Sequence, residues 1–318
     1  MMIWQLPAFV CENELFYFLS QAGEYDESSE PITLDFQYVR YWMPAPIVYI
    51  CGIVCRWLEK GRIVACQNHQ NCKAFSYLQR MDFFVTLGID LPETFRRHPA
   101  GSSFVEIAKI TQNHTRLIDE LTQKLAACLA GENAEDARQL AEFTFGEIIA
   151  NVQQHSLSSG FCCAQYATKH DLARIGVADA GIGILESFRW NNAPAYTANP
   201  QMSHIEALRT ALRPWVSSRK HLRTGPYGDS PNRGVGLNMV QNMISESVGE
   251  LIVASGDAMV RFCGEQDGIW SNLPYPIPGT LVSILFPRGN VPAYHHLLAS
   301  AQTAINLFPD GDDDRYFV

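Results

Sequence analysis

Hydrophobic and polar positions follow first a strand-like and then a helix-like period near the beginning of the chain. The strand-like alternation indicates a half-buried strand. An apolar stretch opened by Pro44 and Pro46 then indicates a buried helix, because proline fits the first turn of a helix. The pattern repeats after Gly61, so this part of the chain predicts a β-α-β-α unit. The predicted strands cover residues 32–36 and 62–66, and the predicted helices cover residues 44–60 and 73–81.

A longer region with mixed periods follows a segment rich in proline, glycine and serine. Residues 90–103 combine these residues with a short basic cluster, which favours a linker and a domain boundary near residue 100. Beyond it, apolar positions recur with helical spacing in some stretches and with strand-like spacing in others. The predicted helices cover residues 104–129, 134–155, 203–212 and 238–247, and the predicted strands cover residues 161–168, 172–178, 251–255 and 280–286.

These elements predict an α/β protein with two domains and a tail. Residues 1–100 would form a small regulatory domain with an N-terminal extension and a linker, and residues 101–290 a larger domain. Residues 291–318 would form a C-terminal helix and a solvated acidic end. A chain of 318 residues, with 47% hydrophobic and 18% charged residues, is long enough to bury two cores.

Charge and cysteine content restrict the compartment and the class of partner. A net charge of -9 argues against binding to nucleic acid, whose affinity comes from Lys and Arg. The most apolar stretch, residues 45–58, contains Arg56 and is shorter than the ~20 residues of a membrane span, so no membrane segment is expected. The 9 cysteines, an odd number in a chain without a recognisable signal peptide, favour free thiols in a reducing cytoplasm.

The predicted helix over residues 134–155 has an apolar side and a polar side. Phe145, Ile148, Ile149 and Val152 follow the helical period and should pack on a sheet. The polar side can simply face solvent, as on most surface helices, or it can line a site. Its residues are Thr144, Glu147, Asn151, Gln154 and His155.

Two pairs of alternating glycines stand next to predicted elements. Asp179 follows a predicted strand and precedes Gly181 and Gly183. A carboxylate at such a position can accept a hydrogen bond from an exocyclic amine, and the glycines let a planar base approach the backbone. Gly234 and Gly236 precede a predicted helix, whose N-terminus favours an anion. Each motif alone is equally compatible with an ordinary turn.

Taken in order, four motifs resemble the nucleotide-binding boxes of the GHKL ATPases. That family includes histidine-kinase catalytic domains, gyrase and heat-shock chaperone ATPase domains, and anti-sigma serine kinases. The resemblance spans residues 134–287 and implies a Bergerat-fold α/β sandwich, with a mixed sheet and helices on one face, that binds ATP and Mg²⁺. The motifs are Glu147-x-x-x-Asn151, Asp179-x-Gly181-x-Gly183, Gly234-x-Gly236-Leu237 and Gly279-Thr280.

The resemblance implies a role for each matching residue. Asn151 would be the Mg²⁺ ligand, since Mg²⁺ prefers hard oxygen ligands and keeps phosphate oxygens and waters around it. Asp179 would accept the adenine amine, with Thr280 in support. The glycine loops would shape the base pocket and close over the phosphates. Their residues are Gly181 and Gly183 on the base side, and Gly234, Gly236, Leu237 and the charge partner Arg233 on the phosphate side.

Glu147 carries the mechanistic part of the resemblance. In hydrolytic GHKL members the matching carboxylate positions and deprotonates the attacking water, whereas histidine kinases need no such base. The resemblance therefore implies an ATPase or a kinase that transfers the γ-phosphate to a protein hydroxyl; the acceptor segment of a histidine autokinase is not evident. A non-catalytic, ATP-gated interaction switch of the anti-sigma or partner-switch type is the alternative. His155 can act in catalysis or only stabilise the helix end.

Two further segments suggest a protein partner. The 50 residues between Gly183 and Gly234 exceed an ordinary connection and favour a nucleotide lid with local positive charge. The first domain resembles the STAS-type domains that partner GHKL kinases, with Asp35 at its first strand end, but lacks the usual Ser or Thr after it. We expect a partner at either segment, and a homodimer stays open. The basic residues of the lid are Arg209, Arg213, Arg219, Lys220 and Arg223.

Several cysteines are candidates for metal ligands. Cys66, His69 and Cys72 contain suitable ligand atoms, but their spacing is not a standard zinc pair and no fourth ligand is obvious. Cys51 and Cys55 lie four residues apart in an apolar helix, which favours buried small hydrophobes. We therefore expect no zinc site.

Overall fold

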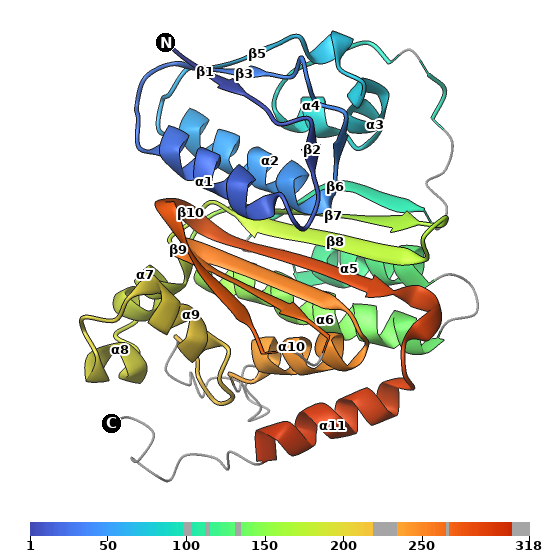
Figure 1. Cartoon of the computed structure of the whole chain (residues 1–318), viewed down its shortest axis with the longest axis vertical. Helices are drawn as coiled ribbons and strands as arrows, with labels where there is room; N and C mark the ends of the chain where they lie inside the picture. The colour runs from blue at the N-terminus through green and yellow to red at the C-terminus, as the bar shows by residue number, and fades with distance from the viewer. Residues whose placement is uncertain are drawn as a thin grey trace.

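The computed structural model describes most of the chain (Figure 1). The described residues are 1–93, 95–97, 103–111, 115–130, 135–218, 234–264 and 267–306. Several sequence-based predictions lie outside these ranges. They are the boundary near residue 100, the lid residues Arg219, Lys220 and Arg223, the phosphate-side Arg233 and the acidic end of the chain.

The N-terminal part of the chain builds a parallel three-stranded sheet in the order β1-β3-β5. Parallel neighbours require a crossover connection, and helices α1 and α2 supply the two crossovers. The predicted first strand and first helix are confirmed, whereas β1 and α1 were not predicted. The elements are β1 (Met2–Gln5), α1 (Leu15–Asp26), β3 (Ile32–Asp35), α2 (Pro44–Glu59) and β5 (Val64–Gln67).

Short elements complete this part of the molecule. A two-stranded parallel sheet lies beside the crossovers, and small helices follow β5. The helix expected at residues 73–81 is confirmed, although it is shorter than predicted. The elements are β2 (Phe9–Val10), β4 (Tyr41–Trp42), η1 (His69–Asn71), α3 (Phe75–Arg80) and α4 (Phe83–Thr86).

Helix α2 is buried between two sheets, which explains its nearly continuous apolar sequence. It begins with Pro44 in its first turn, as predicted, and most of its residues are buried. Its N-terminus lies directly on strand β8 (Leu172–Asp179) of a second, larger sheet, where a Cβ added at Gly176 would be 2.6 Å from the backbone nitrogen of Ala45. A larger residue at position 176 would push helix and sheet apart, so this glycine sets their spacing.

The larger sheet has five strands in the order β6-β7-β8-β10-β9. Every pair of neighbours is antiparallel, so the expectation of a mixed sheet is wrong. The short β7–β8 connection explains one of these pairs, because two consecutive strands joined by a tight loop can pair only in opposite directions. The strands are β6 (Phe104–Ile110), β7 (Gly160–Ala167), β8 (Leu172–Asp179), β9 (Glu250–Cys263) and β10 (Ile269–Pro287).

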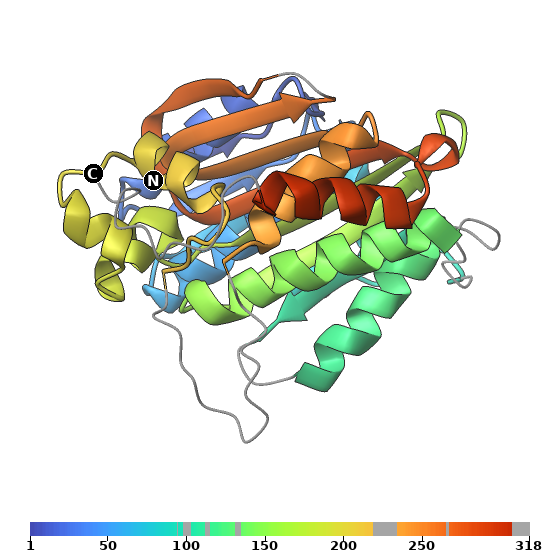
Figure 2. The same cartoon turned by 90° about the horizontal axis from the view of Figure 1, so that it is seen from below.

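Helices cover both faces of the large sheet (Figures 1 and 2). The helices that follow residue 101 pack on one face, and α1 and α2 of the N-terminal part cover the other. Strand β7 shows why. Phe161 and Cys163 pack into the core with α1 and α2, while Cys162 and Ala164 pack into the opposite core. Because both faces of the strand are apolar, each needs its own layer of helices. The second layer contains α5 (Thr115–Ala130), α6 (Glu135–His155) and α10 (Gly236–Glu246), with α11 (Tyr294–Asn306) packed on α10 and α6.

The single helix predicted for residues 104–129 is wrong in its first part. Residues 104–110 form strand β6, and the helix α5 begins only at Thr115. A bulge between Val105 and Ala108 interrupts the pairing of β6 with β7. One extra residue shifts the two-residue alternation out of phase, so the apolar positions imitate the spacing of a helix.

The segment predicted as a lid contains three short helices, α7 (Gly183–Trp190), α8 (Pro194–Ala198) and α9 (His204–Ala211). The last confirms the helix predicted at residues 203–212. It starts with a capping box: the Ser203 hydroxyl accepts the backbone N–H of Glu206, and the Glu206 carboxylate accepts the backbone N–H of Ser203. The segment has a small core of its own, made by Phe188, Ala193, Met202 and Ala207.

No helix among the described residues is long and apolar enough to cross a membrane. The 9 cysteines are all free thiols, as predicted. Cys51 is buried in the core around α2, and Cys55 at the edge of that core is partly buried. Both fit the predicted role of small hydrophobes.

Candidate functional site

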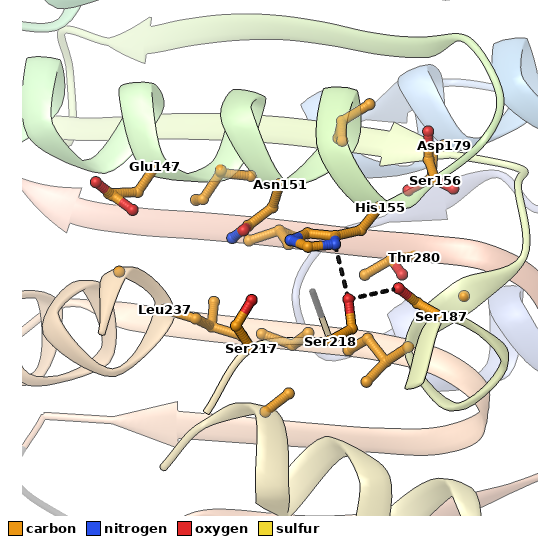
Figure 3. Close-up of a pocket in the computed structure, with 18 of the residues that line it drawn as sticks. Glu147, Asn151, His155, Ser156, Asp179, Ser187, Ser217, Ser218, Leu237 and Thr280 are labelled. Carbon is orange, nitrogen blue, oxygen red and sulfur yellow. Dashed lines mark hydrogen bonds between the residues drawn. The ribbon is translucent and has the colours of Figure 1, made fainter. Parts of the chain in front are cut away.

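A cavity of about 130 Å³ lies beside the Asp179 end of β8, between α6 and the first turn of α10 (Figure 3). Most of the site residues predicted from the sequence line it, although they come from four separate parts of the chain. Gly181 adjoins the cavity through its hydrogen bond to Asp179. The predicted residues in the lining are Glu147, Asn151, Asp179, Gly183, Gly234, Gly236, Leu237 and Thr280.

Helix α6 presents one polar side to this cavity. Glu147, Asn151 and His155 stand one turn apart and all line it (Figure 3). The opposite side of the helix packs on the sheet, as predicted from its apolar stripe. Thr144, predicted on the polar side, is instead fully buried, and its hydroxyl makes no hydrogen bond within the described part of the chain. The polar side is thus the wall of a cavity rather than a solvated face.

Asp179 is the most deeply buried carboxyl group of the cavity. Its side chain is buried at the end of β8 and accepts hydrogen bonds from the backbone N–H groups of Gly181, at 2.8 Å, and Thr280. Burial raises its pKa from 3.8 to about 7, and the two hydrogen bonds oppose this rise only in part. A buried acceptor with spare lone pairs that faces a cavity is suited to an amine donor from a ligand.

The raised pKa makes folding stability depend on pH. Between the ordinary value of 3.8 and the folded value of about 7, the folded protein holds a proton that the unfolded chain releases. Stability contributed by protonated Asp179 is therefore complete below pH 3.8 and is lost as the pH rises to about 7. We expect wild type to lose about 1.4 kcal/mol per pH unit between pH 5 and 7 relative to Asp179→Asn, which cannot ionise. Chemical denaturation of both proteins at several pH values measures this; parallel profiles would contradict it.

The glycines beside Asp179 have no room for a side chain. A Cβ added at Gly181 would overlap the carbonyl oxygen of Ser156, and one at Gly279 would overlap the carbonyl of Asp179. Gly183 has a φ of 74°, which glycine adopts readily, and a Cβ there would lie 2.8 Å from Ser255 Oγ. The glycines therefore allow close packing of the loops against the protein's own backbone and Ser255, whereas the close approach of a planar ligand stays a prediction.

Ser255 ties the two sides of this loop cluster together and was missed by the sequence analysis. Its hydroxyl accepts a hydrogen bond from the Ile184 N–H at 2.9 Å and donates one to the Gly279 carbonyl at 2.9 Å. Thr280 Oγ1 lies 3.3 Å from the same hydroxyl. A serine at this position of β9 belongs to no recognisable motif, so only the fold reveals it.

Glu147 lies where α10 begins. A Cβ added at Gly236 would overlap its carboxylate, so the carboxylate rests on the first turn of that helix. Burial raises the pKa of Glu147 above its ordinary value. Gly234, with a φ of 72°, turns the chain into the helix. The helix N-terminus favours negative charge there, and the negative group that the structure places against it is the Glu147 carboxylate.

A chain of hydroxyl groups runs from the lid to α6 (Figure 3). Ser187 Oγ donates to Ser218 Oγ at 2.9 Å, and Ser218 Oγ lies 2.8 Å from His155 Nδ1. Both serines are almost fully buried. This chain fixes the imidazole of His155 against the lid segment. The two serines follow no spacing that the sequence analysis could have used.

The described basic residues of the lid do not line the cavity. The guanidinium of Arg209 lies 4.8 Å from the centre of the Trp270 ring, an arrangement that attaches α9 to β10. Arg213 is exposed. Within the part of the chain that the structure describes, positive charge from the lid is therefore not directed at the cavity.

The absence of a zinc site, expected from the spacing of Cys66, His69 and Cys72, stays a prediction for the described residues. No three His, Cys, Asp or Glu side chains among them lie together in a way that could hold a metal ion. Burial raises the pKa of Cys66 to about 12, and it raises the pKa of Cys72 as well, which favours the thiol form of both side chains.

Comparison with known proteins adds no relatives to this description. No protein-family model matches the chain, and no curated protein matches it in sequence. The interpretation of the cavity therefore depends on the residues that line it and on the motifs that brought them to attention.

Proposed function

We propose that the chain is an ATP- and Mg²⁺-binding signalling protein that hydrolyses ATP or transfers its γ-phosphate to a protein hydroxyl. The larger part of the chain would then be a Bergerat-type ATP domain, with the N-terminal part as a STAS-like regulatory unit. The main support is the convergence of the four sequence motifs on one cavity. Their order in the chain was the basis of the resemblance, and their common location is an independent observation.

Adenine recognition is supported by the environment of Asp179. Its carboxyl accepts two backbone hydrogen bonds, and the cavity lies on its remaining side. An exocyclic amine would satisfy a further lone pair of this buried group. Apolar side chains from the neighbouring strands, Val177, Val253 and Val282, complete a surface suited to a flat base.

The oxygen donors of the cavity fit Mg²⁺ as an ion bound mainly through phosphates. Asn151 would contribute a carboxamide oxygen, and Mg²⁺ takes its remaining ligands from phosphate oxygens and waters. When bound, the ion would offset the charge of the phosphates. The phosphates would lie beside the N-terminus of α10, where Gly234 and Gly236 line the cavity next to the Glu147 carboxylate.

Glu147 is the group in the cavity best suited to act as a general base. Its raised pKa makes it a stronger base than an exposed glutamate, and its position one turn from Asn151 brings it close to the phosphate side of the cavity. It would orient a water or a protein hydroxyl and accept its proton as the new bond to phosphorus forms.

Binding of a fluorescent ATP analogue to wild type and to Asp179→Asn tests the proposal. Loss of a hydrogen bond to a charged group costs enough to weaken ATP binding about 10- to 100-fold in the variant. Asp90→Asn is the matched control, because Asp90 is exposed and remote from the cavity lining. A wild type that binds no ATP in the presence of Mg²⁺ would refute the proposed function.

A further inference from the structure

Helix α2 of the N-terminal part contacts the adenine side of the cavity from behind the sheet. The Arg56 guanidinium donates a hydrogen bond from Nη1 to the backbone carbonyl of Ala180, at 3.0 Å. Ala180 directly follows Asp179 and is buried. The contact links residues 124 positions apart in the sequence.

Two further residues of α2 lie on the same side of the helix. A Cβ added at Gly52 would lie 3.6 Å from the backbone nitrogen of Ala180, so the helix backbone itself approaches the loop. Tyr49 donates a hydrogen bond to the carbonyl of Pro278 at 3.5 Å, next to Gly279. Positions 49, 52 and 56 follow helical spacing, and they contact both strand ends that form the adenine side.

We propose that Arg56 is a positioning residue of the nucleotide site, which holds the Asp179 loop in the conformation that selects the adenine amine. The inference rests on the proposed function and deepens it, because it assigns base selection partly to the N-terminal part of the chain. Arg56 does not line the cavity and acts through the backbone of Ala180.

The packing of the loop explains why this support matters. On the cavity side, the Ser156 carbonyl accepts the Ile182 N–H at 3.1 Å and stands where a Cβ of Gly181 would be. On the other side stands Arg56. The loop is thus held between two partners, and a guanidinium donor makes a stronger hydrogen bond than a neutral one. Without the hydrogen bond from Arg56, the Asp179 carboxyl group would still accept hydrogen bonds, but its orientation toward the cavity would no longer be fixed.

Selectivity between ATP and inosine triphosphate separates positioning from general stability. The two nucleotides differ at the base, where inosine carries a carbonyl oxygen in place of the amine that Asp179 would accept. We expect wild type to prefer ATP. Arg56→Met should weaken ATP binding on the order of tenfold, as expected for loss of one charged hydrogen bond, and leave inosine triphosphate binding nearly unchanged. Arg56→Lys should retain part of the preference, because lysine keeps one charged donor.

Binding of both nucleotides to the full-length chain, by calorimetry, measures this preference in each variant. Lys60→Met is the matched control, since it removes a cation from the exposed end of the same helix. If Arg56→Met does not fold, the comparison of ATP and inosine triphosphate binding is made with Arg56→Lys alone. An unchanged ATP preference in the folded Arg56 variants would overturn the role of Arg56 and leave the proposed function intact. A wild type that binds neither nucleotide would overturn both.

Discussion

Replacing Glu147 with glutamine is expected to lower ATP turnover by about 10²–10⁴-fold, the usual contribution of a general base. Glutamine keeps the shape of the side chain against Gly236 but cannot accept a proton. ATP binding should change little, because adenine recognition is assigned to Asp179 at another part of the cavity. Phosphate release under saturating ATP and Mg²⁺ measures turnover, and a binding titration of the same protein measures affinity.

The control for this variant is Glu142→Gln, which makes the same change on the same helix. Glu142 pairs with Arg138 and does not line the cavity, so turnover should be retained.

In wild type, turnover should fall as the pH drops through a value above that of an ordinary glutamate, since burial raises the pKa of Glu147. Unchanged phosphate release in Glu147→Gln would remove Glu147 from the mechanism. A wild type that binds ATP without turnover would favour the ATP-gated switch.

The sequence identified the residues of the cavity more accurately than the architecture around them. Short-range patterns placed Glu147 and Asn151 on one side of a helix and Asp179 at a strand end, but only the order of the four motifs, through the family resemblance, joined them into one site. Their common location depends on long-range pairing of β8 with β10, which aligns Asp179 with Thr280. No local pattern encodes that register, so only the motif order suggested it.

The errors in the fold have local physical causes. Helix α1 was overlooked, although Leu15, Phe18, Leu19 and Ala22 have the spacing of one buried helical face. Strand β6 was misread because a bulge altered its alternation. The cover on the second face of the large sheet comes from the N-terminal part, which the sequence analysis treated as a separate domain, although the doubly apolar strand β7 requires cover on both faces.

The contact between α2 and the cavity loop was beyond prediction for a different reason. Arg56 interrupts an apolar helix, and from sequence alone it only argued against a membrane span. Its partner is a backbone carbonyl, which any residue at position 180 would provide. A contact to a backbone atom does not require a particular residue type at that position, so such contacts between separate parts of a chain are often not predicted from the sequence.

Replacing Gly181 with alanine is expected to weaken ATP binding and to destabilise the fold. The added methyl group would overlap the carbonyl oxygen of Ser156, which is backbone and cannot rotate away. Overpacking of this kind costs about 1–3 kcal/mol, and any relief must come from movement of the loop that carries Asp179. Because Asp179 accepts the Gly181 N–H at 2.8 Å, such movement would displace the carboxyl group as well. ATP affinity should therefore fall by on the order of 10²-fold.

Gly146→Ala provides a control that is expected to raise the stability of the fold, whereas Gly181→Ala should lower it. Gly146 lies inside α6 beside Glu147, and an added Cβ would meet no atom within 4 Å. Alanine favours a helix over glycine by about 1 kcal/mol, so this variant should be more stable than wild type and bind ATP equally well. Thermal unfolding and ATP titration of both variants distinguish a steric effect at the loop from a general sensitivity to glycine replacement. If Gly181→Ala binds ATP as wild type does, the tightly packed loop is not part of the nucleotide site.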